Sequence, residues 1–580
     1  MEGPGLATEQ ITRPANRLKA RKPEHYDRRG WLGAGPIVLC IVSVVAATLM
    51  IVRTYSVFDQ TYDEAAHIAC GMEWLDHGTY TYEQLHPPLA RVAAALLPYL
   101  AGVRDRNVPE INADGSAILD WNHQYERNLT LARLGMLPFF WLSCLLLWRF
   151  MATQFSQWHA ALTVIFFAFC PVVLAHSSLA TTDAPLMSTF LWAVMALWSW
   201  LRQPSWTHAA MAGVAVGLAL LSKFTAIPYL ALTGGALLLF VWARGRKFPL
   251  RWREIGVAAV LVALTIWAGY RFQHGSILAT SNPLFAAEER GSLSGDIYNA
   301  VTKLNWVPAN EFFHGMRAAY LQGNEGRLSY LLGHVYKGGR RAFFPVAFLV
   351  KTPIPLLLLF AAGLVWIAYT RAWKRNPATI VPLAGFAGPM SFALTAHMNL
   401  GLRHVIPIYP FAAILGAIGA VELWRVPAQS TLRTAARCAL VLLLAWNIET
   451  CVAAVPDFLA YFNEAARPRA SFYLVDSDLD WGQDVKRLSN KLNELHVQQV
   501  SLDLMTTRNL DEAHLPPFRR LTPGDRPTGW VAIGEYRLKT RGGYDWLDPY
   551  PYTLVGRSIR LYYIPAPPHA GAQLQPPGTR

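Results

Sequence analysis

Charged residues are scarce in this sequence: 16% of its 580 residues are Asp, Glu, Lys or Arg, whereas 53% are hydrophobic. So apolar a composition excludes an ordinary soluble enzyme and indicates a membrane protein. Cysteine is scarce too, because the chain has six and only Cys70 falls outside an apolar run. The sequence therefore offers neither a disulfide framework nor the cysteine spacing of a metal site.

Nucleic-acid-binding motifs are also missing, although the net charge is +14. The basic residues lie mainly in the N-terminal tail and in loops between apolar runs, where they anchor a membrane protein on its cytoplasmic side. This anchoring explains the charge, so we expect membrane lipids and no nucleic acid as partners.

The apolar residues gather in runs of about 17 to 25, the length that a helix needs to cross the hydrocarbon core of a bilayer. We therefore predict an α-helical multi-pass membrane protein with about eleven transmembrane helices. The candidate spans are 33–52, 131–150, 158–176, 183–201, 208–222, 226–243, 255–271, 346–369, 378–396, 405–423 and 437–455.

The distribution of Lys and Arg predicts a cytoplasmic N-terminus, and an odd number of spans places the C-terminal region outside. The N-terminal apolar run is long and lacks a small-residue cleavage site, so we expect it to stay attached. The predicted division is a cytoplasmic basic tail (1–31), a transmembrane domain (32–455) with outer loops 53–130 and 272–345, an extracytoplasmic α/β domain (456–570) and a disordered tail (571–580).

Two outer regions have recognisable local patterns. The stretch HPPLARVAAALLPYLAG, from His86, predicts a helix that is too short to span and lies along the outer interface. In the C-terminal region, SFYLVDSDLDWGQDVKRLSNKLNELHVQQVSLDLM predicts a strand, an acidic turn, an amphipathic helix and a second strand. WVAIGEYRL and SIRLYYI predict further strands.

Three acidic residues stand close to the outer ends of predicted spans: Asp63 and Glu64 in TYDEAAHIACGMEWLDHG, and Asp183 in SSLATTDAPL. Ionisable groups at this depth are costly unless they serve a site. Adjacent residues on a helix point about 100° apart, so Asp63 and Glu64 need not share one task. A solvated loop start for the pair, and a helix N-cap for Asp183, are the structural alternatives.

Basic residues gather on the same face, against the positive-inside bias. They are Lys337, Arg340, Arg341 and Lys351 at the start of one span, and Arg403 and His404 at the start of another. Such side chains suit an anionic headgroup, since Arg offers a fork of donors and Lys a compact charge. Plain attraction to anionic lipid is the alternative for Lys337 to Arg341, and snorkelling accounts for Lys223.

The stretch DSDLDWGQD places Asp476, Asp478, Asp480 and Asp484 close together. An EF-hand is excluded, because Trp481 stands where glycine is required and Arg487 where glutamate is required. A nucleotide-sugar metal site has the right form but no glycine-rich phosphate loop beside it. Two interpretations stay open: a strand-to-helix turn with Asp caps, and an edge that binds substrate or a cation.

Over about residues 30 to 500 the sequence resembles the bacterial polyprenyl-phosphate-dependent glycosyltransferases of the protein O-mannosyltransferase and aminoarabinose-transferase type, within the GT-C superfamily. In chain order, the resemblance is carried by YDEAAH, HPPLARV, TTDAPL, LLSKFTA, FFPVAFLVKTP, LGLRHVIPIYPF, YFNEAARP and VDSDLDWGQD. The sequence departs from that pattern after YFNEAARP, where RASFY stands in place of a glycine-rich turn.

The resemblance implies a GT-C-like fold, an external active site and a lipid-linked sugar as donor. It implies that Asp63 is the catalytic base in the first outer loop and that Asp183 matches a second acid, which in some relatives helps to bind a metal. A divalent cation held by Asp63 and Asp183 is therefore a possible cofactor. Further substrate-site candidates within the shared motifs are His86, Lys223, Asp478, Asp480, Trp481, Gln483 and Asp484.

These observations predict a bacterial inner-membrane glycosyltransferase that moves a sugar from a polyprenyl phosphate to a protein, lipid or glycan acceptor on the outer face, with inversion. Asp63 deprotonates the acceptor. Arg403, with Lys351, Arg340 or Arg341 in reserve, compensates the leaving phosphate. Glu64 and Asp183 orient the base or hold the cation. The alternatives are a transporter or lipid flippase and a catalytically silent scaffold.

Overall fold

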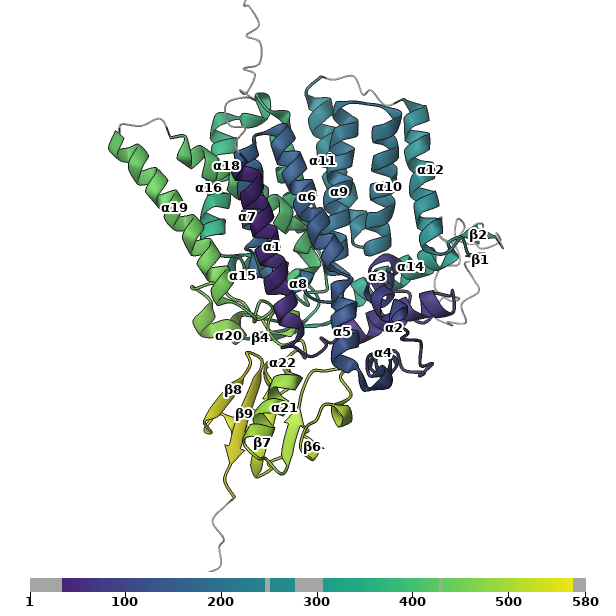
Figure 1. Ribbon diagram of the computed structural model, residues 1–580, viewed down its shortest axis with the longest axis vertical. Coiled ribbons are helices and arrows are strands. Elements are labelled where there is room, and N and C mark those ends of the chain that lie inside the picture. Colours follow the sequence, from purple (N-terminus) through teal and green to yellow (C-terminus); the bar gives the residue numbers. More distant parts are fainter. Residues whose placement is uncertain (1–33, 246–250, 277–305, 427–429, 567–580) are drawn as a thin grey trace, which may run out of the picture.

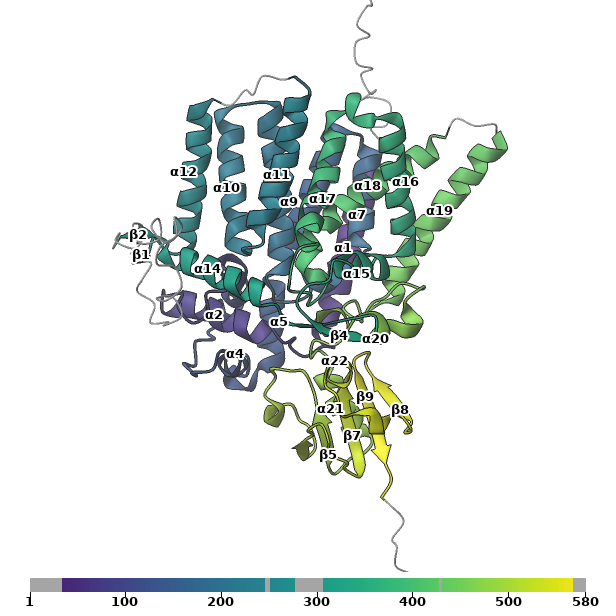
Figure 2. The same cartoon turned by 180° about the vertical axis from the view of Figure 1, so that it is seen from behind.

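The computed structural model describes residues 34–245, 251–276, 306–426 and 430–566. A bundle of long helices occupies one end of the molecule, a layer of short helices and loops lies beneath it, and a small sheet domain projects from that layer (Figures 1 and 2). The predicted tails 1–31 and 571–580, and the middle of the predicted loop 272–345, lie outside the described residues.

The bundle follows the predicted spans. Among the described residues, seven helices are long and apolar enough to cross a membrane, or up to nine if each of two bent pairs is one span. The predicted spans 208–222 and 378–396 correspond to shorter helices of 17 and 14 residues. The bundle helices are α1 (Gly35–Tyr55), α6 (Leu137–Gln154), α7 (Gln157–Ala168), α9 (Asp183–Arg202), α10 (Trp206–Ser222), α11 (Ala226–Ala243), α12 (Trp252–Gly269), α16 (Ile354–Thr370), α17 (Ile380–Ala393), α18 (Tyr409–Trp424) and α19 (Ser430–Ala453).

One predicted span, 346–369, is broken in the structure. Helix α15 (Phe343–Lys351) and α16 meet at an angle of 117°. Thr352 between them has an extended backbone, with ψ of 136°, because the ring of Pro353 disfavours a helical conformation in the residue before it. The break leaves Lys351 at the end of α15, on the side of the bundle that faces the outer layer.

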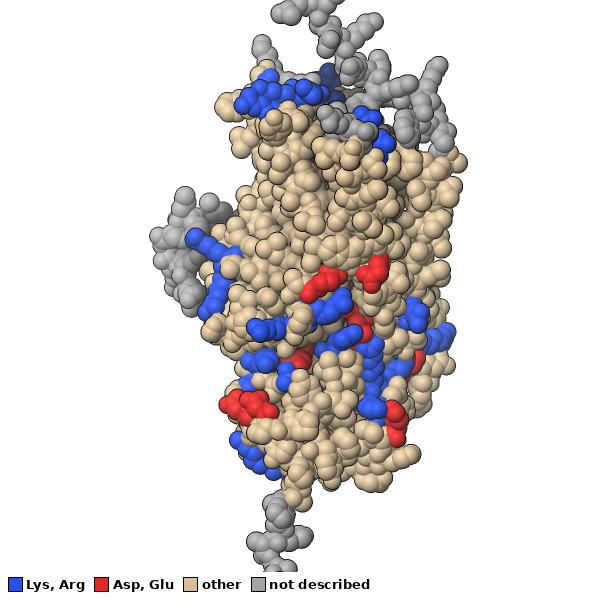
Figure 3. Space-filling view, turned by 90° about the vertical axis from the view of Figure 1, so that its left-hand side faces the viewer, with Lys and Arg blue, Asp and Glu red and all other residues tan. Residues whose placement is uncertain are grey.

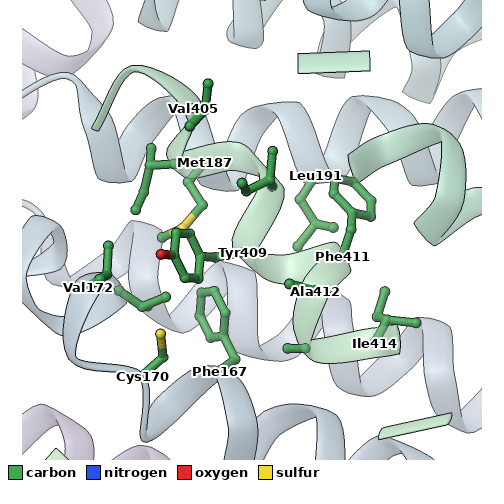
Figure 4. Close-up of a cluster of buried hydrophobic side chains, with 14 of the residues drawn as sticks. Phe167, Cys170, Val172, Met187, Leu191, Val405, Tyr409, Phe411, Ala412 and Ile414 are labelled. Carbon is green, nitrogen blue, oxygen red and sulfur yellow. The ribbon is translucent and has the colours of Figure 1, made fainter. Parts of the chain in front are cut away.

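The core of the bundle is one continuous apolar cluster. Figure 4 shows part of it, where Tyr409 of α18 packs beside Phe167 of α7 and Met187 of α9, and Phe411 of α18 lies beside Leu191 of α9. In the view of Figure 3, the bundle presents a belt without charge, with basic side chains at one edge and both signs of charge beyond the other. This belt has the surface that a lipid bilayer requires.

Four helices of the first outer loop form most of the layer beneath the bundle: α2 (Glu64–Asp76), α3 (Pro88–Leu100), α4 (Ile111–Leu119) and α5 (Tyr125–Leu134). The helix predicted from His86 is α3, which begins at the second of two prolines. The α2 backbone lies against its neighbours, since a Cβ at Gly71 would overlap the Arg91 carbonyl of α3. The layer is therefore tightly packed around α2.

The rest of the outer layer comes from the second outer loop. It contains α14 (Asn310–Glu325) and the antiparallel hairpin of β3 (Leu328–Leu331) and β4 (His334–Lys337). A two-stranded pair, β1 (His274–Gly275) with β2 (Val307–Pro308), joins α12 to α14.

The C-terminal domain is a five-stranded sheet in the order β6-β5-β7-β9-β8. Pairings β5–β6 and β5–β7 are parallel, and the pairings of β9 with β7 and β8 are antiparallel. The predicted amphipathic helix is α21. The elements are α21 (Val485–Glu494), β5 (Val500–Asp503), β6 (Phe518–Arg520), β7 (Gly529–Gly534), α22 (Glu535–Thr540), β8 (Tyr552–Val555) and β9 (Ile559–Ile564).

Two strand predictions need correction. SFYLV was predicted as a strand, but Ala470–Tyr473 is a helical turn, α20. Leu474 and Val475, which follow it, pack into the core of the bundle, so this segment has no place in the sheet. WVAIGEYRL is a strand only as far as Gly534, and its second half is α22.

Candidate active site

Asp63 and Arg403 meet where α2 begins, in the layer beneath the bundle. Asp63 is the residue that precedes α2, and Arg403 belongs to a short 3₁₀ segment (Leu402–Ile408) that leads into α18. Arg403 Nη1 lies 2.7 Å from Asp63 Oδ2, with 25% of the Asp63 side chain and 9% of the Arg403 side chain exposed. Asp63, the predicted base, and Arg403, the predicted phosphate-binding residue, are thus in contact. The Asp63 carboxylate remains accessible to solvent.

The acidic loop, residues 476–484, holds these two side chains in place. The Trp481 ring lies beneath the Arg403 guanidinium, 4.3 Å from ring centroid to Cζ, a distance typical of a cation–π contact. The Trp481 carbonyl accepts a hydrogen bond from the amide of Tyr62, next to Asp63, at 2.9 Å. The Asp478 carboxylate accepts from the amide of Leu402, next to Arg403, at 3.2 Å. One loop therefore fixes both partners of the ion pair.

The remaining polar groups of the acidic loop connect it to its surroundings. Gln483 accepts from the Trp481 amide and donates to the Leu479 carbonyl, so it shapes the loop itself. Asp480 accepts from the amide of Tyr536, at 2.9 Å. Asp484 accepts from the Ser558 hydroxyl, at 2.8 Å. These carboxylates attach the sheet domain, and Asp484 stands at the N-cap position of α21 without capping it.

Glu64 points away from Asp63 into the protein. Its carboxylate is completely buried and receives two hydrogen bonds of 2.9 Å from Arg133, as well as bonds from the amides of Thr61 and Ala180. Burial alone would raise the pKa of Glu64, but Arg133 and the other donors outweigh it and hold the pKa below its usual value. Glu64 therefore anchors the start of α2, and its oxygens are already saturated.

Asp183 lies in a second buried ion pair. It begins α9, after Thr182 at the N-cap, and its Oδ1 lies 2.9 Å from Lys223 Nζ. His176 Nδ1 lies 3.6 Å from the other oxygen. Lys223 is at the end of α10, so this pair joins two bundle helices. Arg403 is within electrostatic range of Asp183 as well as of Asp63, which places the two ion pairs side by side.

Two histidines near these pairs have nitrogen atoms without a hydrogen-bond partner. Within the described residues, His67 Nε2 and His404 Nε2 are buried and unpartnered, and so is Arg403 Nε. His86 lies within range of Asp63, Lys223 and Arg403, and burial together with Lys223 lowers its pKa to about 4. Buried polar atoms without partners are rare in native proteins, so this concentration marks a place for a ligand rich in hydrogen-bonding oxygen atoms.

The other basic candidates lie elsewhere. Lys351 is buried and donates to the carbonyls of Leu459 and Asp478, so it braces the acidic loop from within. Lys337, Arg340 and Arg341 are exposed on β4 and the turn before α15. The Arg340 guanidinium lies over the ring of Tyr336. The structure does not bring these four residues into contact with Asp63.

The predicted acids do not fit a divalent cation. Asp63 and Asp183 are each paired with a basic side chain, and Glu64 is saturated by hydrogen bonds. Nowhere in the described ranges do three or more His, Cys, Asp or Glu side chains gather in a geometry that could hold a metal ion.

Sequence reasoning missed several residues of this region. Arg133 and His67 carry no local signal, because Arg133 occupies an ordinary helical position and His67 differs from its neighbours only in polarity. Asp476 was noticed in the acidic loop but was not predicted as a site residue. Its positive φ of 55° is a feature that only the structure reveals.

Comparisons with known proteins support the resemblance stated above. Residues 127–268, from α5 to α12, match the model of the dolichyl-phosphate-mannose-protein mannosyltransferase family. No curated protein matches the chain in sequence.

Solved structures share the architecture. The chain is similar to the S. cerevisiae protein O-mannosyltransferase Pmt1-Pmt2 complex bound to the sugar donor, with a TM-score of 0.50, 12% identity, and coverage of 74% of this chain and 91% of that one. It is also similar to ArnT from Cupriavidus metallidurans bound to undecaprenyl phosphate, with a TM-score of 0.47, 12% identity, and coverage of 91% and 98%.

The fold comparison and the helix pattern together define the class of protein. The chain is a multi-span α-helical membrane protein with a GT-C-like fold and a small C-terminal α/β region, as predicted from the sequence. The family match supports the resemblance to the polyprenyl-phosphate-dependent glycosyltransferases over residues 127–268, and the solved structure shows the shared fold.

Proposed function

We propose that this protein is a glycosyltransferase that moves a sugar from a polyprenyl phosphate to an acceptor on the outer face of a bacterial inner membrane. The observation that carries the proposal is the Asp63–Arg403 pair, a solvent-accessible carboxylate beside a guanidinium, with buried unpartnered nitrogens of histidine next to it. The family match supports a lipid-phosphate donor, because that family is described by its dolichyl-phosphate-mannose substrate.

Asp63 acts as the general base in this proposal. It accepts the proton of an acceptor hydroxyl or amine while the oxygen or nitrogen attacks the anomeric carbon of the sugar from the face opposite the phosphate. The bond between the anomeric carbon and the phosphate oxygen breaks, and the polyprenyl phosphate leaves with the electron pair. A single displacement of this kind inverts the anomeric configuration.

Arg403 stabilises the leaving phosphate. Its planar guanidinium is held from below by Trp481 and offers further N–H groups, one of them the unpartnered Nε, to the phosphate oxygens. Lys223 and Arg403 are both within electrostatic range of His404, so these three side chains can act on the same anion. Because Arg403 and Lys223 are buried, their interactions with the phosphate are less screened and stronger than in water.

The orientation of the protein in the membrane is inferred from the positions of its basic residues. The basic residues Arg371 and Lys374 connect α16 to α17 at the end of the bundle remote from the sheet domain. Lys and Arg in short loops mark the cytoplasmic side, so the sheet domain and Asp63 are external. The site therefore lies where a lipid-linked sugar and an extracytoplasmic acceptor meet.

The direct test is transfer by the purified full chain in detergent. Polyprenyl phosphates carrying labelled sugars, mannose first, are incubated with a cell-envelope fraction from a strain that lacks the protein. We expect label to move into the envelope fraction in proportion to enzyme. A transporter or flippase needs two compartments and gives no transfer in detergent, so inactivity with a full panel of donor sugars would overturn the proposal.

A further inference from the structure

A narrow cleft opens beside the ion pair, between the outer layer and the sheet domain. Its walls come from β3 (Ser329 and Tyr330), the start of α15 (Phe343), the loop before Arg403 (Asn399), the acidic loop (Asp476) and α22 (Tyr536), and its cavity volume is about 10 Å³. Leu400 and Val475 complete the lining. A cavity of this size has room for about one water-sized group, such as a single hydroxyl.

Asn399 supplies an unused donor to this cleft. Only 2% of Asn399 is exposed, and its Oδ1 accepts hydrogen bonds from the backbone amide of Arg340 at 2.7 Å and from the Tyr336 hydroxyl at 3.1 Å. A backbone N–H can only donate, so the orientation of the side-chain amide is fixed. Nδ2 is therefore the donor, and it has no partner among the described residues. A buried N–H group without a partner indicates a ligand that accepts from it.

Asp476 supplies an acceptor on the same cleft. Its Oδ1 accepts from the amide of Ser477 at 2.6 Å, and no other hydrogen bond to its carboxylate is found within the described residues. Its φ of 55° is unusual for a residue other than glycine. Strained backbone of this kind persists where surrounding structure enforces it, often at functional sites. Asp476 is within electrostatic range of Arg403 and Asp63, so the cleft adjoins the reacting groups.

The position of the cleft distinguishes its occupant from the donor. Tyr536 belongs to the sheet domain, so the cleft opens on the aqueous side of the ion pair. Under the proposed function the lipid-linked donor approaches from the bilayer, on the side of Lys223 at the end of α10. An acceptor that approaches from the aqueous side would then meet the cleft first.

We propose that this cleft is the acceptor subsite and that it binds a hydroxyl-bearing group. Asn399 Nδ2 donates a hydrogen bond to the hydroxyl oxygen, and the hydroxyl donates a hydrogen bond to the Asp476 carboxylate. The proposal rests on the proposed function. It assigns the sheet domain a part in acceptor binding through Tyr536. Serine or threonine side chains and sugar hydroxyls share this chemistry, and the two sources are separated by digesting the labelled product with protease or with glycosidase.

The test compares half-saturating concentrations of donor and acceptor. Wild type, Asp476→Asn and Tyr536→Phe are assayed with labelled polyprenyl-phosphate mannose, or with the sugar that the panel identifies, and with dilutions of the envelope fraction as acceptor. We expect Asp476→Asn to need about tenfold more acceptor, since a hydrogen bond to a charged group is lost. Tyr536→Phe changes the polarity of the cleft wall and should raise the acceptor requirement by a smaller factor. The half-saturating donor concentration should stay within about twofold of wild type. The same should hold for the rate at which the enzyme releases free sugar from the donor when no acceptor is present.

Tyr536→Phe keeps the ring and the backbone contacts of α22, so it folds even if Asp476→Asn does not. Asp511→Asn, an exposed acid of the same domain, is the matched control and should behave as wild type. An unchanged acceptor requirement in Tyr536→Phe and Asp476→Asn, or a rise in the donor requirement instead, would overturn the acceptor subsite while the proposed function stands. Absence of transfer by wild type would overturn both.

Discussion

Arg403 Nη1 and Asp63 Oδ2 lie 2.7 Å apart although 340 residues separate them in the chain. The contact joins the first outer loop to the start of α18, and the acidic loop from a third region braces both partners. Three distant segments thus converge on one carboxylate and one guanidinium. The proposed reaction needs this convergence, because the base and the phosphate ligand must act on the same sugar carbon.

Arg403→Lys tests whether the phosphate needs only a positive charge at position 403 or also the planar guanidinium group. Lysine keeps the positive charge but cannot offer a planar fork or stack on Trp481. We expect kcat to fall about 10- to 100-fold, with a smaller change in the half-saturating donor concentration, because stabilisation of the leaving group acts mainly in the transition state.

The matched control for Arg403 is Arg340→Gln, at an exposed arginine that lies over Tyr336. Its transfer kinetics should stay within about twofold of wild type. A large loss of transfer rate in Arg340→Gln, together with normal kinetics in Arg403→Lys, would contradict this assignment. It would indicate that the exposed basic residues of β4 and the turn before α15 bind the phosphate instead.

Glu64→Gln tests the buried anchor of α2. The substitution leaves the Arg133 guanidinium, which is 1% exposed, without its carboxylate partner. Breaking a buried ion pair from one side typically costs about 3–5 kcal/mol, because the remaining charge is uncompensated. We expect a clear fall in the thermal unfolding temperature in detergent, whereas Glu126→Gln on the exposed face of α5 should leave it unchanged. Equal stability of the two variants would show that Glu64 is not an anchor.

Trp481→Leu removes the ring beneath Arg403, and Trp481→Phe keeps an aromatic face there. A cation–π contact contributes about 0.5–2 kcal/mol, so the leucine variant should lose roughly 3- to 30-fold in kcat when Arg403 is no longer held in place. The phenylalanine variant should recover most of that loss. If both variants transfer sugar at the same rate, Trp481 supports Arg403 only by filling space.

The acceptor requirement should depend on pH through Asp476. Burial raises the pKa of Asp476 to about 7, and nearby Arg403 opposes this rise, whereas Asp63 and Asp478 add to it. The carboxyl group is therefore mostly protonated at pH 6 and mostly ionised at pH 8, and the ionised form is the stronger hydrogen-bond acceptor. His86 is already neutral across this range, since its pKa is lowered to about 4.

We expect the half-saturating acceptor concentration to decrease from pH 6 to pH 8 in the wild type and to be flat over the same range in Asp476→Asn. The measurement is the acceptor titration repeated at five pH values with saturating donor. A slope that persists in Asp476→Asn would assign the titration to another group.

Local sequence patterns predicted the helices well because membrane spans are set by runs of apolar residues. The α3 helix, the start of α21 and the strands β5 and β9 were predicted for the same reason: periodicity and turn residues are local. SFYLV was predicted wrongly because a short apolar run suits a strand and a buried turn equally well. Only its packing against the bundle decides between them.

The proposed site depends on contacts that the sequence does not display. Depth and motifs single out Asp63 and Arg403 separately, but their contact joins chain segments 340 residues apart. The sequence offers Lys351 as a reserve for Arg403, yet the bend between α15 and α16 directs it toward the carbonyls of Leu459 and Asp478. The sequence predicts that Glu64 orients Asp63 or holds a cation, whereas the structure pairs Glu64 with Arg133 on α5. Long-range pairing of this kind leaves no periodic signal in a sequence.

The most direct measurement of the central claim is the turnover of Asp63→Asn beside Asp511→Asn, with labelled lipid-linked sugar and purified, correctly folded protein. General-base catalysis contributes about 10²- to 10⁴-fold, so we predict a loss of that size in kcat for Asp63→Asn, with donor binding retained and Asp511→Asn fully active. Undiminished transfer by Asp63→Asn would contradict the account.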